Sequence, residues 1–239
     1  FELLKNEKDI QLHLAWEGMP AADILEGIDA VITRGIGQVN RALYDACPNM
    51  KVAARCGVGL DNVDVAEASK RGIKVINAPG SNASTVAEHT ISLMLTIQRN
   101  LFEALSAVKN GQWASRSSFK SDELNGKTLG IIGLGNIGLK VANIAAAFGM
   151  KVIYHNRSQL SPQLEAECKA SYVSKEELLK TADHVVLVVP YSAESHHTIG
   201  AKELGLMKPT ATLVNIARGV IVDDAALAKA LAASQIAAA

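Results

Sequence analysis

Three glycines, Gly133, Gly135 and Gly138, have the spacing G-x-G-x-x-G between an apolar run and a segment with helical spacing. The first glycine allows a tight turn out of a strand, the second leaves room for a pyrophosphate, and the third lets the helix approach the strand. The N–H groups of Asn136 and Ile137 would then face the phosphates at the positive end of the helix dipole. Since a second strand follows, the motif predicts a dinucleotide site, whereas a glycine-rich turn that only packs closely is the alternative.

The residues after that second strand would meet the adenosine ribose. Sites for NAD usually place Asp or Glu there, where the carboxylate accepts hydrogen bonds from the ribose 2′-hydroxyl. This chain has Asn156, Arg157 and Ser158 instead. Because no carboxylate repels a 2′-phosphate and a guanidinium can pair with one, we expect NADPH to be preferred. The alternative is a solvated Arg157 and a site that accepts NAD as well.

The elements that must position these residues alternate between strand and helix. Strands are expected at Asp29–Thr33, Lys51–Arg55, Ile73–Asn77, Thr128–Ile132, Lys151–Tyr154, His184–Val189 and Ala211–Asn215, with Ile10–Leu14 also apolar and extended. Helices are expected at Val63–Arg71, from a cap at Ser84 or Thr85 onward, and at Leu101–Gly111, Asn136–Phe148, Lys175–Thr181, Ala201–Met207 and Asp223–Ser234. Continuous apolar strands separated by helices predict an α/β fold in which parallel strands are covered on both faces.

Composition excludes several classes of protein. Of the 239 residues, 49% are hydrophobic, which is enough for a core and argues against disorder. The formal net charge of +0 argues against nucleic-acid or membrane-surface binding, and no apolar run is long enough to span a bilayer. Three scattered cysteines, Cys47, Cys56 and Cys168, have neither metal-site nor disulfide spacing, which suits the cytoplasm. We expect Cys56 to be a buried, inert thiol.

Several segments together resemble one family, the D-isomer-specific 2-hydroxyacid dehydrogenases. They are Gly57–Asp64, Thr85–His89, the glycine motif, Val189–Pro190, and Asn215–Gly219 followed by Val222–Asp223. They cover nearly the whole chain in the family's order. Within the family, Asn156–Arg157 and Glu194–His197 are most similar to the glyoxylate/hydroxypyruvate reductase and 2-ketogluconate reductase branch.

The resemblance implies two domains and a site between them. Residues 1–80 would form a smaller, flavodoxin-like α/β domain that binds the substrate. Residues 81–239 would form the Rossmann-type doubly wound parallel sheet that binds the cofactor. Family members are usually dimers, and the apolar helix Ala87–Arg99 could support a homodimer.

The resemblance also implies roles for single residues. Arg218 would grip the carboxylate and carbonyl of a 2-oxo acid, and the backbone N–H groups of Val58 and Gly59 would hold its carboxylate. Pro190 and Ile216 would line the nicotinamide side. Without the surrounding motifs, Arg218 would be read as an exposed arginine, and Val58–Gly59 as an ordinary turn. Thr85 would either touch the cofactor or cap its helix.

The expected proton donor is absent from this sequence. In the family a histidine oriented by a glutamate performs this step, and both would follow Ala239. We therefore expect that the chain is truncated at both ends, and that it binds NADP(H) but turns over poorly.

These observations predict an oxidoreductase that transfers hydride from NADPH to a small 2-oxo acid and forms the D-2-hydroxy acid. Glyoxylate, hydroxypyruvate and 2-ketogluconate are the substrates considered. One alternative is a non-catalytic, dinucleotide-sensing interaction protein, as in the family's corepressor branch. Another is a different member of the family, such as formate or phosphoglycerate dehydrogenase.

Overall fold

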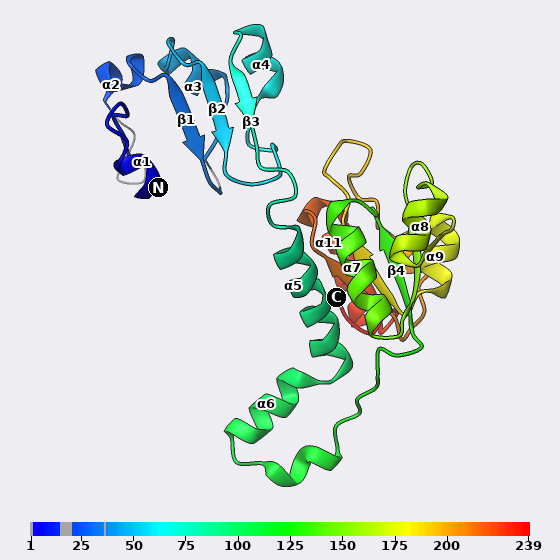
Figure 1. The fold of residues 1–239 in the computed structure, drawn as a ribbon. Helices are drawn as coiled ribbons and strands as arrows, with labels where there is room; N and C mark the ends of the chain where they lie inside the picture. Colours follow the sequence, from blue (N-terminus) through cyan, green and yellow to red (C-terminus); the bar gives the residue numbers. More distant parts are fainter. Residues whose placement is uncertain (1, 15–20, 36) are drawn as a thin grey trace. The chain divides into compact units, whose positions relative to one another are not determined.

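The computed structural model describes residues 2–14, 21–35 and 37–239, and it divides the chain into two compact units. Unit 1 is Phe1–Ser81 and unit 2 is Asn82–Ala239 (Figure 1). We describe each unit by itself.

Unit 1 contains a three-stranded parallel sheet with the order β1-β2-β3. Its elements are α1 (Glu2–Lys5), α2 (Ala22–Glu26), β1 (Ala30–Thr33), α3 (Arg41–Ala46), β2 (Val52–Arg55), α4 (Val65–Lys70) and β3 (Lys74–Ile76). On the central strand, Ala53 is paired with Val31 and Val75, and all three contribute to the core of the unit. The parallel α/β arrangement expected for this part of the chain is therefore confirmed.

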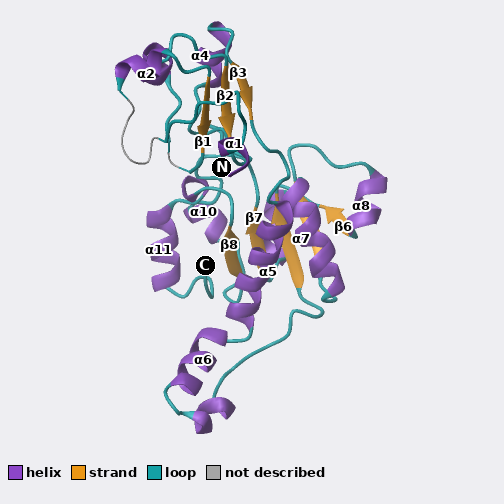
Figure 2. Cartoon of the chain, turned by 60° about the vertical axis from the view of Figure 1, so that its left-hand side comes forward, coloured by secondary structure: helices purple, strands orange, loops and turns teal. Residues whose placement is uncertain are grey.

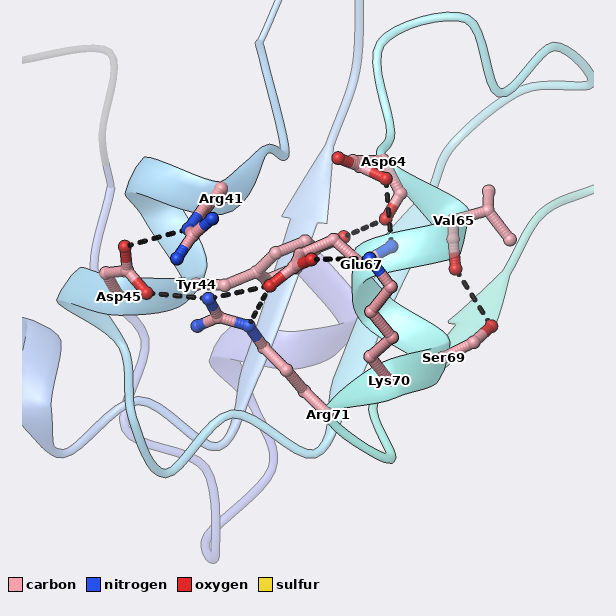
Figure 3. Close-up of polar contacts among 9 residues, drawn as sticks. All are labelled: Arg41, Tyr44, Asp45, Asp64, Val65, Glu67, Ser69, Lys70 and Arg71. Atoms are coloured by element: carbon pink, nitrogen blue, oxygen red, sulfur yellow. Dashed lines mark hydrogen bonds and ion pairs between the residues drawn. The ribbon is translucent and has the colours of Figure 1, made fainter.

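Helices α3 and α4 are joined by a polar cluster at the surface of unit 1 (Figure 3). The guanidinium of Arg71 donates to Asp45 at 2.7 Å and to Glu67 at 2.9 Å, and it lies over the ring of Tyr44. The Tyr44 hydroxyl donates to the carbonyl of Asp64, whose carboxylate caps α4. These contacts fix α4, and with it the turn that precedes β3.

Unit 2 is a five-stranded parallel sheet with the order β6-β5-β4-β7-β8. Its strands are β4 (Thr128–Ile132), β5 (Lys151–His155), β6 (Ala170–Tyr172), β7 (His184–Leu187) and β8 (Thr212–Asn215). Its helices are α5 (Ala83–Gln98), α6 (Leu101–Lys109), α7 (Asn136–Ala147), α8 (Pro162–Cys168), α9 (Lys175–Thr181), α10 (Ala201–Leu204) and α11 (Asp224–Ala232), with 3-10 turns η2 (Trp113–Ser117) and η3 (Gly219–Ile221). The strand order runs outward in both directions from β4, which is the doubly wound arrangement.

Helices cover both faces of this sheet. Buried residues of α5 and α7 form one cluster with β4 and β5, whereas those of α9, α10 and α11 form another with β7 and β8. Figures 1 and 2 show α5 and α7 lying along the sheet, while α6 extends away from it. The predicted Rossmann-type fold class is confirmed.

The structure corrects several predicted elements. Ile10–Leu14 has no regular secondary structure and pairs with no described strand, because an apolar run alone does not supply a hydrogen-bonding partner. The sequence prediction missed β6 and α8, which are only three and seven residues long. Helix α5 begins after Asn82, so neither Ser84 nor Thr85 is its cap. Within the described residues, no helix has both the length and the apolar character needed to cross a membrane.

Candidate dinucleotide-binding site

The carboxyl ends of three neighbouring strands meet beside the glycine motif. Ile132, the last residue of β4, is paired with His155 at the end of β5 and with Leu187 at the end of β7. The segments that follow these strands must therefore leave the sheet side by side. Such a place, where the strand order reverses, is where open α/β sheets bind ligands.

Each glycine of the motif has a distinct steric surrounding. A Cβ atom on Gly133, whose φ is +101°, would lie 2.8 Å from the Val188 carbonyl carbon, so this turn packs directly against the end of β7. A Cβ atom on Gly138 would lie 2.8 Å from the carbonyl oxygen of Gly133, which shows how closely α7 approaches the turn. A Cβ atom on Gly135 would meet no protein atom within 4 Å. Packing therefore requires Gly133 and Gly138, whereas Gly135 borders open space of the kind that a phosphate could occupy.

The N-terminus of α7 faces this space without a side-chain cap. Gly135 occupies the N-cap position, and no acidic residue lies in the first turn. The first hydrogen bond of the helix runs from the N–H of Leu139 to the carbonyl of Gly135. The N–H groups of Asn136 and Ile137 therefore lack intrahelical acceptors and carry the positive end of the helix dipole, as an anion site requires. These residues fit a dinucleotide pyrophosphate.

Asn156 makes a contact that its predicted role did not include. Its Oδ1 accepts the N–H of Leu134 at 2.7 Å, and its Nδ2 donates to the carbonyl of Leu134 at 3.2 Å. Both ends of the carboxamide thus bind one residue of the glycine turn. Asn156 therefore fixes the turn to the end of β5, and this use of its side chain adds to the predicted contact with the ribose.

Arg157 and Ser158 follow Asn156 and are exposed, the side chain of Arg157 to 89%. Their backbone is held again at Leu160, whose N–H donates to the Tyr154 hydroxyl at 2.8 Å. That hydroxyl donates to Glu165 at 2.7 Å, and burial together with the bond to Glu165 raises the pKa of Tyr154 to about 12. The phenol therefore stays protonated. Its hydrogen bonds fix the backbone at Leu160, shortly after Arg157.

Arg218 lies in a short turn after β8, next along the same edge of the sheet. Asn215 closes this turn, because its Oδ1 accepts the N–H of Ala217 at 3.0 Å and its Nδ2 donates to the carbonyl of Arg218 at 2.8 Å. The exposed guanidinium of Arg218 donates to the carbonyl of Ala217. The half-buried Ile216 is tied to β7 through its N–H and the carbonyl of Leu187.

The other predicted residues of this edge have simpler surroundings. Pro190 is exposed after β7, and its carbonyl accepts the hydroxyl of Ser195 at 2.9 Å. Thr85 is exposed in the first turn of α5, so its role as a helix cap is excluded. Sequence reasoning missed the contacts of Asn156 and Asn215. For Asn215 there is a general signal, since the side chain of Asn often closes a turn with the residues that directly follow it.

Val58 and Gly59 belong to unit 1, in the turn after β2. The carbonyl of Gly57 accepts the N–H of Ala78, and the carbonyl of Val58 accepts Nδ2 of Asn77 at 2.8 Å. Both acceptors of the turn are thus bound from the end of β3. Because the N–H of a trans peptide points opposite its carbonyl, the N–H groups of Val58 and Gly59 point away from the end of β3.

Cys56, in the same turn, is exposed, whereas a buried thiol was expected. The carbonyl of Cys56 accepts a guanidinium N–H of Arg55 at 2.5 Å, and the Arg55 side chain lies directly beneath Gly57. The guanidinium of Arg55 thus occupies the space beneath Gly57, while the Cys56 thiol is exposed.

Comparison with known proteins identifies the family. The sequence model described as "D-isomer specific 2-hydroxyacid dehydrogenase, NAD binding domain" matches residues 91–239. A glyoxylate reductase of Thermococcus gammatolerans is 40% identical over 96% of this chain and 71% of its own length. A hydroxypyruvate reductase of Thermotoga maritima is 38% identical over 95% of this chain and 72% of its own. A D-3-phosphoglycerate dehydrogenase of Methanocaldococcus jannaschii is 40% identical over 93% of this chain and 43% of its own.

Solved structures agree with these sequence relatives. The D-lactate dehydrogenase of Aquifex aeolicus, complexed with NAD and lactic acid, superimposes with a TM-score of 0.83 at 33% identity, over 91% of this chain and 65% of its own. An acyclic imino acid reductase in complex with NADPH and D-Arg gives 0.81 at 30% identity, over 92% and 71%. This chain therefore spans about two thirds of the length of these neighbours, and both nicotinamide cofactors occur among them.

Proposed function

The chain belongs to the D-isomer-specific 2-hydroxyacid dehydrogenase family, and from this premise we propose that it reduces a small 2-oxo acid with NADPH. The products would be D-2-hydroxy acids, and the substrates glyoxylate, hydroxypyruvate or 2-ketogluconate. The observation that carries the proposal is the uncapped N-terminus of α7 above the open space at Gly135. A nicotinamide dinucleotide is the cofactor that family membership supports.

Residues of unit 2 would hold the cofactor. The N–H groups of Asn136 and Ile137 would bind the pyrophosphate, with Gly135 leaving room for it. Pro190 and Ile216 would border the nicotinamide, which supplies the hydride when bound. Thr85 would contact the cofactor from the first turn of α5.

The residues at the end of β5 support the proposed preference for NADPH. The carboxamide of Asn156 carries no charge and already binds Leu134, so it would not repel a 2′-phosphate. The exposed guanidinium of Arg157 and the hydroxyl of Ser158 would bind that phosphate. NAD would bind more weakly, since its 2′-hydroxyl offers Arg157 no anion.

Three groups would hold the substrate. The N–H groups of Val58 and Gly59 would bind its carboxylate, and the guanidinium of Arg218 would pair with the carboxylate and polarise the neighbouring carbonyl. When hydride adds to the carbonyl carbon, negative charge gathers on the oxygen, and Arg218 would stabilise it. The proton for that oxygen would come from a histidine that a glutamate orients, as in the family.

The cofactor proposal is tested by the binding of NADPH and NADH to the 239-residue chain, measured by calorimetry. We expect both to bind, NADPH more tightly. The variant Gly135→Val should abolish binding without loss of folding, because its side chain would fill space that no protein atom occupies. The absence of binding to the unchanged chain would contradict the proposal, and so would unaltered binding to the variant.

A second candidate function, a dinucleotide-sensing protein without catalysis, predicts the same binding. Steady-state assays of the full product of the gene separate the two. Loss of NADPH absorbance on addition of glyoxylate, hydroxypyruvate or 2-ketogluconate supports the reductase, and loss with none of them supports the sensor. 3-Phosphohydroxypyruvate should be included, because a phosphoglycerate dehydrogenase is among the relatives.

We also propose that the protein is a homodimer, through a different helix from the one expected. The apolar residues Ala87, Ile91 and Met94 of α5 are buried within unit 2, and Leu93 of the same helix is 37% exposed. On α6, by contrast, Phe102 and Leu105 are 72% and 69% exposed. A second copy that covers this face would remove apolar surface from water. Sedimentation should show a dimer that Phe102→Glu dissociates and Glu103→Gln leaves intact.

The proposal includes a cytoplasmic location. Its support is that Cys47, Cys56 and Cys168 are free thiols. Fractionation of source cells would test it, and recovery outside the cytoplasm would contradict it.

A further inference from the structure

Arg157 has an acidic neighbour that comes from a distant part of the sequence. The guanidinium Nη1 lies 3.4 Å from Oε2 of Glu194, in the segment after β7. The two side chains are 89% and 79% exposed, and the ion pair rests on a single long contact. Exposed pairs of this kind are weak, so a more highly charged anion can displace the carboxylate.

The position of Glu194 is set by a compact turn. The N–H of Ser192 donates to the Ser195 hydroxyl at 2.7 Å, and this hydroxyl donates to the carbonyl of Pro190 at 2.9 Å. The Thr198 hydroxyl donates to the carbonyl of Ser195 at 2.7 Å. Since these bonds lie on both sides of Glu194, they hold the backbone from which its carboxylate reaches Arg157.

We propose that Glu194 is a specificity-determining residue, whose carboxylate competes with the 2′-phosphate of NADP(H) for the guanidinium of Arg157. This inference rests on the proposed function, in which Arg157 binds that phosphate. The pair lies one residue beyond Asn156, which is hydrogen-bonded to the glycine turn, so it belongs to the end of the site where the adenosine ribose would lie.

The competition acts on one cofactor. A 2′-phosphate carries between one and two negative charges near neutral pH, so binding it at Arg157 places two anions close together on one guanidinium. A 2′-hydroxyl carries no charge, and NAD(H) can bind while the Arg157–Glu194 pair stays intact. Glu194 therefore makes the affinity for NADPH exceed the affinity for NADH by a smaller factor than Arg157 alone would give.

The test compares the dissociation constants of NADPH and NADH for the 239-residue chain and four variants, at low and at moderate ionic strength. Glu194→Gln removes the charge but keeps the shape of the side chain. Glu103→Gln, on the exposed surface of α6, is the control for a change of net charge. Arg157→Gln and the double variant, Arg157→Gln with Glu194→Gln, show whether the effect of Glu194→Gln on NADPH binding depends on the arginine.

We expect Glu194→Gln to tighten NADPH binding by roughly threefold to tenfold and to change NADH binding by less than about twofold. The gain should shrink as salt is added, because the groups are exposed. Glu103→Gln should change neither cofactor, and Glu194→Gln should give a much smaller gain in the Arg157→Gln background.

Equal effects of Glu194→Gln on both cofactors, or no effect on NADPH, would overturn the inference while the proposed function stands. Failure of the unchanged chain to bind either cofactor would instead contradict the proposed function, and the inference with it. Thermal melting of each variant shows whether an affinity changed through loss of folding.

Discussion

His184 makes the stability of unit 2 depend on pH in a way that can be calculated. It is the first residue of β7, its side chain is buried, and its Nδ1 lies 2.7 Å from the Thr212 hydroxyl on β8. Its Nε2 is buried and has no hydrogen-bond partner among the described residues. Burial lowers the pKa of His184 from 6.5 to about 4, although the neighbouring Asp183 acts in the opposite direction. The folded protein therefore holds the neutral imidazole.

The direction of the effect follows from linkage. Above about pH 6.5 the imidazole is neutral in both the folded and the unfolded chain, so the protonation of His184 does not lower the free energy of unfolding. As the pH falls from 6.5 to 4, the unfolded chain takes up a proton that the folded chain does not, and stability is lost. At about 1.4 kcal/mol per pKa unit, the loss is about 2 kcal/mol at pH 5 and about 3 kcal/mol below pH 4.

Urea unfolding at about pH 7.5 and pH 5, followed by circular dichroism, measures this loss. His184→Asn keeps a polar atom near the position of Nδ1 but has no group that titrates in this range. We expect the free energy of unfolding to fall by about 2 kcal/mol more in the unchanged protein than in this variant. The exposed His89 supplies the control, since His89→Asn should keep the full dependence on pH. If the free energy of unfolding falls equally between the two pH values in the unchanged protein and in His184→Asn, the reasoning is refuted.

Three further predictions concern contacts that hold the site. Asn156→Ala should weaken NADPH and NADH binding about equally, by roughly fivefold to tenfold, because it frees the glycine turn rather than removing a charge; calorimetry with both cofactors checks this. Asn77→Ala should raise KM for the 2-oxo acid severalfold in the full gene product and leave the Kd of NADPH unchanged, since it releases the Val58 carbonyl. Gly130→Ala should lower the free energy of unfolding by about 1–3 kcal/mol in urea titrations, because its Cβ would lie 2.6 Å from Leu178. Unequal cofactor effects in the first, a changed Kd in the second, or unchanged stability in the third would contradict the respective argument.

The parts of the fold that sequence predicted well depend on local properties. Strand β4 and helix α9 have the predicted limits, because a continuous apolar run and a helix with a Ser cap are defined by neighbouring residues. The roles of Gly133 and Gly138 in the glycine turn could likewise be predicted from their spacing alone. The turn is only a few residues long, and each role requires only that the residue has no side chain.

The missed features depend on residues brought together from far apart in the sequence. Asn156 and Leu134 are 22 residues apart, and Arg157 and Glu194 are 37 apart. Their contacts follow from the order of β5, β4 and β7 in the sheet, which no local pattern contains. The burial of Ala87, Ile91 and Met94 of α5 likewise depends on the fold, which places them in one cluster with residues of α7.

A common device explains how the turns of the site are held without adding charge. Asn77, Asn156 and Asn215 lie at the carboxyl ends of β3, β5 and β8, and each binds backbone atoms of a turn predicted to bind a ligand. Aspartate could accept the same N–H bonds, but it could not donate to a carbonyl, and it would place a negative charge beside ligands that are themselves anions. A carboxamide supplies both a donor and an acceptor on a short side chain. The choice of Asn over Asp thus adds no negative charge at these three positions beside Arg157, Arg218 and the α7 N-terminus.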